Sequence, residues 1–221
     1  MATMDISRLV RSDFDRVVAV EMDSAGRAVL FRRGTNDVVT REVLSFQPWL
    51  LVSGPELARA LKDTSEITPL RGDGMHRVRV SFPSWSAYEA AVKDLKELTG
   101  MNPSAALAPY RLFTDKAQQM LTMLPARLFR GMSFQDLRRL QLDIETRTGE
   151  GFHFPDALRE SDEVLLISLK DNRGWECSLS VAEAGEAAML KRMLELIQER
   201  DPDVIEGHNI FNFDLDYLEK R

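Results

Sequence analysis

The stretch QLDIETRTGE, residues 141–150, decides the fold of the C-terminal part of the chain. Side chains on a strand alternate between two faces, so a strand through DIET places Asp143 and Glu145 on one face and Leu142 and Ile144 on the other. Two carboxylates held that close disfavour each other's ionisation unless a cation lies between them. The apolar face predicts the buried side of a sheet. The acidic face indicates either a divalent metal site or a solvated strand end.

The segments around DIET predict a sheet with helices. Residues 137–146, 162–171 and 174–180 each have the pattern of a strand, and three strands in succession favour an antiparallel meander. A long amphipathic helix follows over 185–203, then a short strand at 203–209 and a final helix from Phe213. The expected apolar face of the long helix consists of Met189, Leu190, Met193, Leu194 and Ile197. The order β-β-β-α-β-α is that of an α/β sandwich.

The N-terminal part mixes strands and helices and predicts a compact α+β unit. Expected elements are a hairpin at 17–23 and 27–33, a strand at 49–54, a brief helix at 55–62, a strand at 76–82, a helix at 84–100 and a helix at 115–123. The helix at 84–100 has Trp85, Tyr88, Val92, Leu95 and Leu98 at helical spacing, with Ser84 as its cap and Gly100 as its end. Residues 101–109 form a connector by composition, and irregular chain is expected after 123. We place the division between the two domains at 1–131 and 132–221.

Composition limits the possible functions. The chain has 221 residues, a net charge of −6 and a pI of about 5.2, which argues against a protein that coats nucleic acid by charge alone. No membrane span or secretory signal is apparent, so the simplest expectation is a cytoplasmic chain without membrane contact. Cys177 is the only cysteine, which excludes an internal disulfide, and we expect it to be a small buried hydrophobe. Because the chain has only three histidines and one cysteine, we expect any metal ion to be held by oxygen ligands rather than at a structural zinc site.

A second acidic segment is IEGHNIFNFDLDYL, residues 205–218. Gly207 permits a close approach of the backbone to a ligand, and Asn209 offers both a donor and an acceptor. Asp214 falls in the first turn of the expected last helix, where it either stabilises the helix dipole or joins the acids of DIET. Asp216 would serve the dipole equally well, so helix stability does not single out Asp214.

Together these segments resemble the proofreading 3′→5′ exonuclease domain of the family B DNA polymerases. DIET, 143–146, matches the first exonuclease motif of that family, and GHNIFNFDLDYL, 207–218, matches the second. LFRGMSFQDLRRLQ, 128–141, and FQPWLLVS, 46–53, are similar to segments that these polymerases carry just upstream and in their N-terminal domain. The resemblance spans most of the chain but is specific in about the last 90 residues.

The resemblance implies an α/β chain, with an α+β N-terminal domain followed by a ribonuclease H-like mixed-sheet exonuclease domain that is incomplete at its C-terminus. It also implies a site. Asp143, Glu145 and Asp214 would be the catalytic carboxylates and the ligands of two Mg²⁺ or Mn²⁺ ions. Asn209, Phe213 and Thr146 would hold the single-stranded 3′ end. The reaction would be hydrolysis of the 3′-terminal phosphodiester of DNA.

The third motif of the family, a tyrosine followed four positions later by an aspartate, is not found before Arg221. We therefore expect a fragment with little nuclease activity of its own, taken from a DNA polymerase that acts in the cytoplasm at the nucleoid. Its partners would be DNA, as a single-stranded 3′ end or primer-template, and the remaining polymerase domains.

Two alternatives stay open. A stand-alone exonuclease of the same fold is one. The other is a non-catalytic module that binds single-stranded DNA or template through arginines, which we weigh against ordinary solvated charges. Those arginines are Arg77, Arg79, Arg127, Arg130, Arg138 and Arg139.

Overall fold

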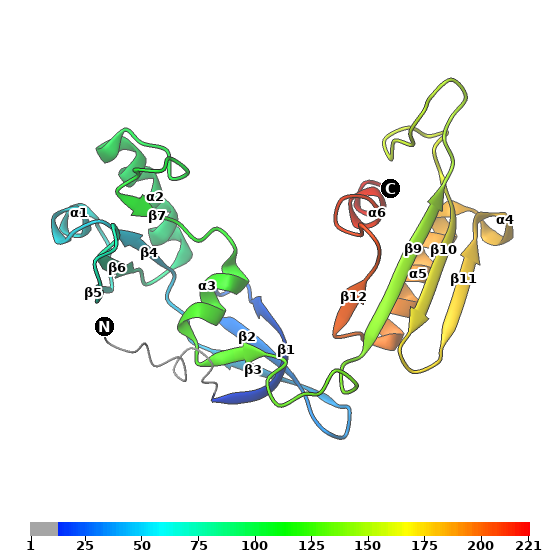
Figure 1. Ribbon diagram of the computed structural model, residues 1–221, viewed down its shortest axis with the longest axis horizontal. Coiled ribbons are helices and arrows are strands. Elements are labelled where there is room, and N and C mark those ends of the chain that lie inside the picture. Colours follow the sequence, from blue (N-terminus) through cyan, green and yellow to red (C-terminus); the bar gives the residue numbers. More distant parts are fainter. Residues whose placement is uncertain (1–12) are drawn as a thin grey trace. The chain divides into compact units, whose positions relative to one another are not determined.

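The computed structural model describes residues 13–221, and the chain divides into two compact units between Gly131 and Met132 (Figure 1). The first unit contains two four-stranded sheets, and the second contains one.

The first sheet has the strand order β3-β2-β1-β8. Its strands are β1 (Phe14–Met22), β2 (Ala28–Arg33), β3 (Val39–Leu44) and β8 (Ala126–Leu128). The predicted hairpin is confirmed, because β1 and β2 pair antiparallel. The expectation of irregular chain after residue 123 is wrong at β8, which pairs parallel with β1. The predicted helix at 115–123 is confirmed as α3 (Lys116–Met123), capped by the side chain of Asp115.

The second sheet of the first unit has the order β5-β6-β4-β7. Its strands are β4 (Trp49–Val52), β5 (Glu66–Pro69), β6 (Val78–Ser81) and β7 (Tyr110–Arg111), and its helices are α1 (Pro55–Ala60) and α2 (Trp85–Thr99). Helix α2 begins after Ser84, whose hydroxyl accepts the N–H of Ala87, and it ends at Gly100 in the left-handed conformation, as predicted. Of the five residues at helical spacing, Tyr88 and Leu95 enter the core, whereas Leu98 is exposed.

The second unit contains the predicted meander. The sheet order is β11-β10-β9-β12, with β9–β10 and β10–β11 antiparallel and β12 parallel to β9. The strands are β9 (Arg139–Thr146), β10 (Val164–Asp171), β11 (Glu176–Ser180) and β12 (Val204–Glu206). The helices are α4 (Val181–Ala184), α5 (Glu186–Arg200) and α6 (Asp214–Lys220). The mixed α/β fold expected for this part is therefore confirmed, with α4 as an additional turn of helix.

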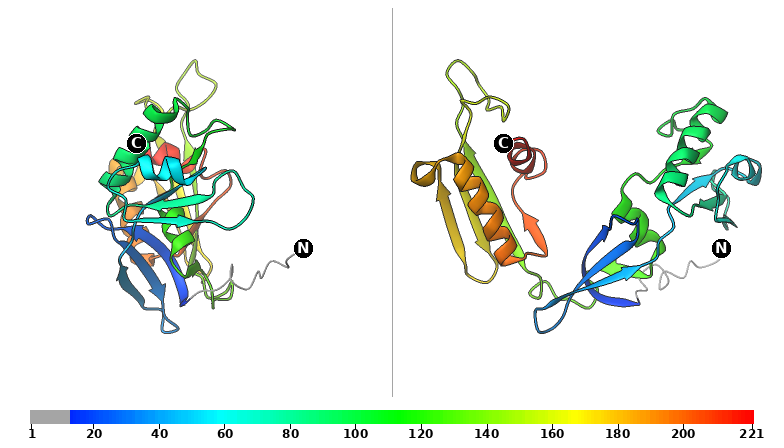
Figure 2. Two further views of the ribbon diagram at one scale, coloured as in Figure 1. Left: turned by 90° about the vertical axis from the view of Figure 1, so that its left-hand side faces the viewer. Right: turned by 180° about the vertical axis from the view of Figure 1, so that it is seen from behind.

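One face of this sheet is covered by α5, which lies behind the strands in Figure 1 and in front of them in the right-hand view of Figure 2. Leu140, Leu142 and Ile144 of β9 alternate into this buried side. The helix contributes Met189, Met193 and Leu196 to the core, whereas the predicted Leu194 is exposed. Cys177 is half-buried at the edge of this core rather than fully buried. The uncovered face therefore carries the polar residues of the same strands.

Candidate active site

The acid pair of DIET lies on the uncovered face of β9. Asp143 and Glu145 are exposed and alternate with the buried Leu142 and Ile144, as predicted. Asp143 lies opposite Ser168 of β10, and Glu145 lies opposite Leu166. Because the pair points away from the core, both carboxylates are accessible to solvent and to a ligand on this face.

Asp214 is brought to the same strand from the far end of the sequence. Strand β12 pairs with β9 only as far as Gln141, so β12 does not cover the β9 edge beyond it. The chain then turns through residues 207–213 and begins α6 at Asp214. The Asp214 residue is 3% exposed, and its Oδ1 accepts the backbone N–H of Ile144 at 3.1 Å. The third acid is thus held against the backbone N–H of the residue that lies between Asp143 and Glu145.

Gly207 makes this return of the chain possible. A Cβ at this position would lie 2.6 Å from the carbonyl oxygen of Leu142 and 3.1 Å from Cδ1 of Ile210. No side chain can replace this hydrogen without moving backbone. The close approach predicted from the sequence is therefore present, but the neighbour is β9 itself rather than a ligand.

The donor chemistry of these residues fits a hard divalent cation. Mg²⁺ and Mn²⁺ prefer oxygen ligands, and all three residues supply carboxylates. A carboxylate has two oxygens, so Asp214 can keep its bond to Ile144 through Oδ1 and offer Oδ2. Among residues 13–221, however, no three His, Cys, Asp or Glu side chains lie close enough together to hold an ion as they stand. The three residues thus have the ligand atoms that such an ion prefers, but their side chains lie too far apart to bind one together as they stand.

The residues predicted to hold a DNA 3′ end lie around the same end of the sheet. Asn209 is exposed with φ of 55°, and its carbonyl oxygen accepts the N–H groups of Asn212 and Phe213, which forms the turn into α6. Phe213 is half-buried, with its ring centroid 5.5 Å from that of Tyr217. Thr146 ends β9 opposite Val164 and is half-buried. Of the three predicted contacts, Asn209 is the most available to a ligand.

A groove of about 860 Å³ runs over the uncovered face of the sheet beside the acid pair. It contains Asp143 but neither Glu145 nor Asp214. Glu206 and His208, which line it where β12 ends, were not predicted from the sequence. They lie here because β12 ends at Glu206, opposite Gln141 of the parallel β9 and two residues before Asp143. The remaining lining residues come from β9, β10 and β11 and from the turn after β12: Gln141, Leu142, Ser168, Leu169, Lys170, Glu176, Cys177, Ser178 and Gly207.

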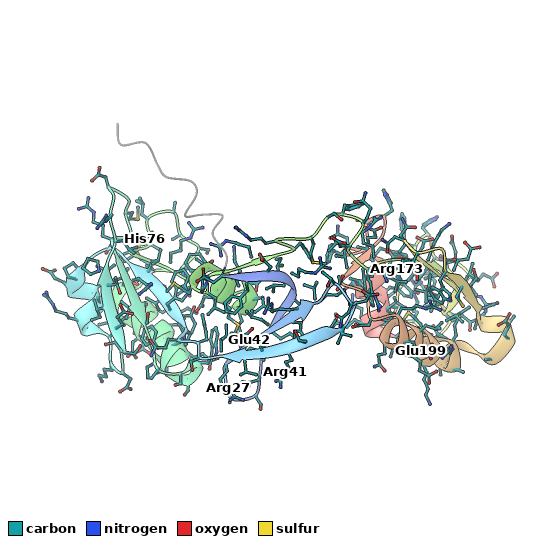
Figure 3. The ribbon with its side chains drawn as sticks, turned by 90° about the horizontal axis from the view of Figure 1, so that it is seen from below. Arg27, Arg41, Glu42, His76, Arg173 and Glu199 are labelled. Carbon is teal, nitrogen blue, oxygen red and sulfur yellow. The ribbon has the colours of Figure 1, made fainter. Side chains whose placement is uncertain are left out.

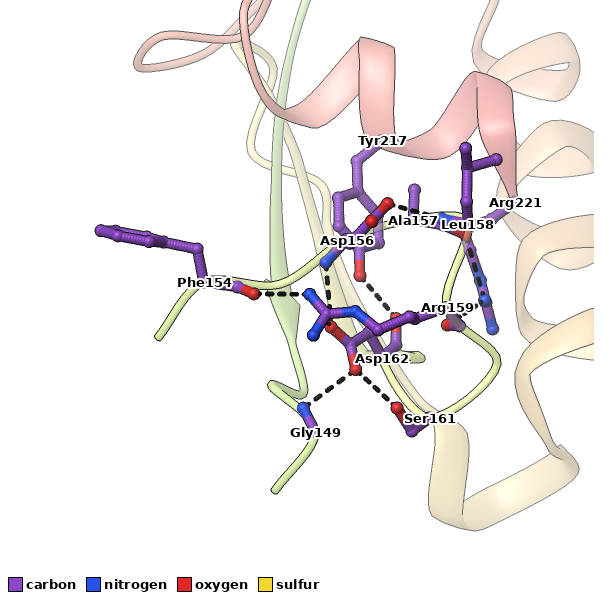
Figure 4. Close-up of polar contacts among 10 residues, drawn as sticks. All are labelled: Gly149, Phe154, Asp156, Ala157, Leu158, Arg159, Ser161, Asp162, Tyr217 and Arg221. Carbon is purple, nitrogen blue, oxygen red and sulfur yellow. Dashed lines mark hydrogen bonds and ion pairs between the residues drawn. The ribbon is translucent and has the colours of Figure 1, made fainter. Parts of the chain in front are cut away.

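The loop between β9 and β10, residues 147–163, is fixed by a buried aspartate (Figure 4). Asp162 is fully buried, and its carboxylate accepts the backbone N–H groups of Gly149 and Asp156 and the hydroxyl of Ser161, each within 2.9 Å. Arg159 adds an ion pair of 3.0 Å. Burial raises the pKa of the Asp162 carboxyl, but these hydrogen bonds and the arginine outweigh it and hold the pKa below its ordinary value.

The same loop is tied to α6. The Tyr217 hydroxyl donates to the carbonyl oxygen of Asp162 at 2.5 Å, and Arg221 donates to the carbonyl oxygens of Ala157 and Arg159. Arg221 also forms an ion pair with Glu186 at the start of α5. Burial raises the pKa of Glu186, but the bonds from Arg221 and from the N–H of Val164 lower it below its usual range. The loop, the helix that carries Asp214 and the first turn of α5 therefore form one connected layer.

The arginines considered for template binding are engaged within the chain. Arg79 donates to Glu66 and Thr68, Arg139 to Glu206, and Arg127 to backbone carbonyl oxygens. Arg130 pairs with Asp15, Arg138 donates to the carbonyl oxygen of Arg200, and Arg77 donates to that of Gly74. Three of the charged residues labelled in Figure 3 also have ion-pair partners nearby: Arg27 pairs with Asp23, Glu42 with Arg32 and Glu199 with Arg192. This pattern favours ordinary surface charges over a phosphate-binding stripe.

Comparison with known proteins agrees with this geometry. The family model of the DNA polymerase family B exonuclease domain matches residues 122–221. A DNA polymerase of Desulfurococcus sp. (strain Tok) is 40% identical over 95 residues, and one of Thermococcus gorgonarius is 36% identical over 95 residues; each match covers 39% of this chain. These matches span 12% of the length of the two relatives. The structure of the family B DNA polymerase from Pyrobaculum calidifontis aligns with a TM-score of 0.61 at 19% identity, over 92% of this chain and 31% of that one.

Over 92% of its length the chain therefore has a fold similar to part of the Pyrobaculum calidifontis polymerase structure. Residues 122–221 are similar to the exonuclease domain of the DNA polymerase family B, the part of the chain in which the DIET and GHNIFNFDLDYL segments lie. No helix within residues 13–221 has both the length and the apolar character needed to cross a bilayer.

Proposed function

We propose that residues 132–221 carry the chemistry of a 3′→5′ proofreading exonuclease, which hydrolyses the 3′-terminal phosphodiester of DNA, and that residues 1–131 are the N-terminal domain of a family B DNA-directed DNA polymerase. The observation that carries the proposal is the 3.1 Å bond from Ile144 N–H to Asp214 Oδ1, because it joins the two motifs at the acid pair. The family match of residues 122–221 supports the same interpretation. DNA, as a 3′ end or primer-template, and further polymerase domains are the proposed partners, with action at the nucleoid in the cytoplasm.

Asp143, Glu145 and Asp214 are the proposed catalytic residues and ligands of Mg²⁺ or Mn²⁺ at a two-metal site. Bound divalent ions supply neutralisation of phosphate charge and a water of lowered pKa. The two exposed acids present their oxygens to the DNA side of the sheet, and the buried Asp214 fixes α6 beside them. Asn209, Phe213 and Thr146 are the proposed contacts of the single-stranded 3′ end.

The 221-residue chain should be a poor catalyst by itself. Within residues 13–221 no three acidic, His or Cys side chains are spaced to hold an ion, so divalent cations should bind weakly and DNA should be hydrolysed slowly. A Mg²⁺-dependent release of mononucleotides at a rate typical of enzymes, lost in Asp143→Ala, would show that this expectation of low activity is wrong.

The metal site itself is tested without DNA by Mn²⁺ titration of the ¹⁵N-labelled chain. Paramagnetic broadening should begin at the amides of residues 143–146 and 213–215. It should be lost in Asp143→Asn and in Asp214→Asn, although in the second variant the new amide oxygen can still accept the N–H of Ile144 and keep the fold. Asp216→Asn is the matched control on the same helix turn, where the native carboxylate is exposed and pairs with Lys220. The proposed site would be refuted if the wild-type chain showed no broadening at residues 143–146 and 213–215, or if the broadening survived in Asp143→Asn.

A further inference from the structure

Helix α6, which carries Asp214, is too short to set its own orientation. It has seven residues, and no side chain caps its first turn. Isolated helices of this length are unstable in water, so contacts with the rest of the second unit hold α6 in place. Leu215 and Leu218 pack against the core, but apolar contacts have no preferred direction and specify the rotation of a helix about its axis only weakly. Directional contacts therefore decide where Asp214 lies.

Three polar side chains on one side of α6 supply these directional contacts. Asp214, Tyr217 and Arg221 follow one another at intervals of three and four residues, which places them along one face of the helix. Asp214 accepts the backbone N–H of Ile144 in β9, and the Tyr217 hydroxyl donates to the carbonyl oxygen of Asp162 at 2.5 Å. Arg221 donates to two further carbonyl oxygens of the β9–β10 loop. Each turn of α6 is thus bonded to a different point of the unit.

The acceptor of the Tyr217 hydroxyl is itself held in place. Asp162 is fully buried, and its carboxylate accepts two backbone N–H groups and a hydroxyl of the same loop (Figure 4). Two residues later, Val164 begins β10 opposite Thr146, the last residue of β9. A closed ring of contacts therefore runs from β9 through Asp214, Tyr217 and Asp162 to β10 and back to β9.

The hydroxyl is the part of Tyr217 that packing does not require. The residue is 4% exposed, and its ring lies in the core beside Phe213, where a phenylalanine would fill the same space. Burial raises the pKa of the Tyr217 hydroxyl, so it stays protonated and remains a donor at neutral pH. What the hydroxyl adds to the ring is one directional bond to a fixed acceptor.

We propose that Tyr217 is a positioning residue for Asp214. Its bond to the Asp162 carbonyl oxygen fixes the rotation of α6, which keeps the Asp214 carboxylate against β9 beside the acid pair. The role of Tyr217 toward a bound divalent ion rests on the proposed exonuclease function. Its role toward the Ile144 N–H does not, because that bond is present without metal or DNA.

The Ile144 amide reports on this positioning directly. Tyr217→Phe keeps the ring but removes the hydroxyl bond, so Asp214 should hold the Ile144 N–H less well. In hydrogen exchange of the ¹⁵N-labelled chain, Ile144 should exchange about fivefold faster than in wild type, beyond any change at residues 166–169 of β10. Wild type in urea, matched to the same loss of unfolding free energy, shows what uniform destabilisation does to these amides. A merely structural role would give equal factors in the two samples.

A double-mutant cycle tests whether Tyr217 acts through Asp214. Asp214→Ala removes the acceptor of the Ile144 N–H, so adding Tyr217→Phe to it should not accelerate Ile144 further. If Asp214→Ala does not fold, the urea comparison alone decides. In Mn²⁺ titrations followed by broadening at residues 143–146, Tyr217→Phe should bind the ion about tenfold more weakly than wild type, as expected for loss of a group that orients a ligand.

Tyr110→Phe is the matched control in the first unit. The Tyr110 hydroxyl also donates from a buried ring to a backbone carbonyl oxygen, that of Met101 at 2.7 Å. Its loss should change neither Ile144 exchange nor Mn²⁺ binding. The proposal is overturned if Ile144 in Tyr217→Phe exchanges no faster than in the urea-matched wild type, if Tyr217→Phe still accelerates it without the Asp214 carboxylate, or if wild type binds Mn²⁺ and the variant binds it equally well. Absence of Mn²⁺ broadening in wild type would instead refute the metal site, while the exchange of Ile144 still decides the positioning.

Discussion

Replacement of Gly207 by alanine tests whether the return of the chain to β9 depends on a missing side chain. The added Cβ would lie 2.6 Å from the Leu142 carbonyl oxygen, which is 0.8 Å short of the 3.4 Å at which ordinary contact begins. Backbone must yield on one side, because the obstructing atom belongs to a central strand. Overpacking of this kind costs about 1–3 kcal/mol. For a cooperative unit of about 90 residues, ~2 kcal/mol lowers the melting temperature by about 8–16 °C.

The assay for Gly207→Ala is differential scanning calorimetry combined with hydrogen exchange of the β9 peptide. The transition of the second unit should fall, and amides of residues 140–146 should exchange faster, while strands of the first unit keep their protection. Gly74→Ala is the matched control, since a Cβ at Gly74 meets nothing within 4 Å. If Gly207→Ala melts within about 2 °C of Gly74→Ala, the close approach to Leu142 does not limit this site.

Three further outcomes follow from the second unit. Asp162→Asn should destabilise the chain above about pH 5 and progressively less below about pH 4. The folded state lowers the pKa of Asp162, so the ionised carboxylate stabilises the fold above the pKa of the unfolded state, and this stabilisation is lost as the pH falls. Urea titrations from about pH 3 to about pH 7 measure the difference in unfolding free energy between wild type and variant. A difference that stayed constant over this range would contradict the prediction. Tyr217→Phe, which removes the hydroxyl bond to the Asp162 carbonyl, should cost about 1 kcal/mol in the same titration near neutral pH, and no change would exclude a contribution from that bond. Met193→Ala should cost about 2–5 kcal/mol and Leu194→Ala less than about 0.5 kcal/mol, because only the first is buried; equal losses would show that the helix face is misassigned.

The sequence predicted those strands and helices in which the local pattern of apolar residues matches the residues that are buried in the structure. The alternation in β9 and the apolar run in β10 are local signals, and the structure confirms both strands. Strand β8 has only three residues and exists because β1 pairs with it across more than a hundred residues of sequence, which no local window contains. Of the predicted face of α5, only Leu194 is wrong, while the buried Leu196 was not predicted. Six apolar residues lie within 189–197, and only packing decides which of them are buried.

The strand face that carries the acid pair was predictable from the sequence, whereas the position of Asp214 against it was less so. Asp143 and Glu145 follow from strand alternation alone, and the structure confirms their shared face. The length of the turn from Gly207 to Phe213 determines that Asp214 is the residue that contacts β9. This turn has no periodic sequence pattern from which the contact could be predicted. The turn leaves the ring of Phe211 81% exposed and half-buries the ring of Phe213 two residues later, a difference that the sequence pattern does not predict.

The contrast between Asp214 and Asp216 shows what the return of the chain accomplishes. Both aspartates lie in the first turn of α6, where a negative charge is favourable, and the exposed Asp216 with its partner Lys220 suffices for that purpose. Burial of a carboxylate is unfavourable unless a donor or a cation compensates it. Asp214 is buried and has the Ile144 N–H as a donor. Helix stability alone would not require this burial. The buried Asp214 instead fixes the position of α6, because its bond to Ile144 holds the first turn of the helix beside the residue that lies between Asp143 and Glu145.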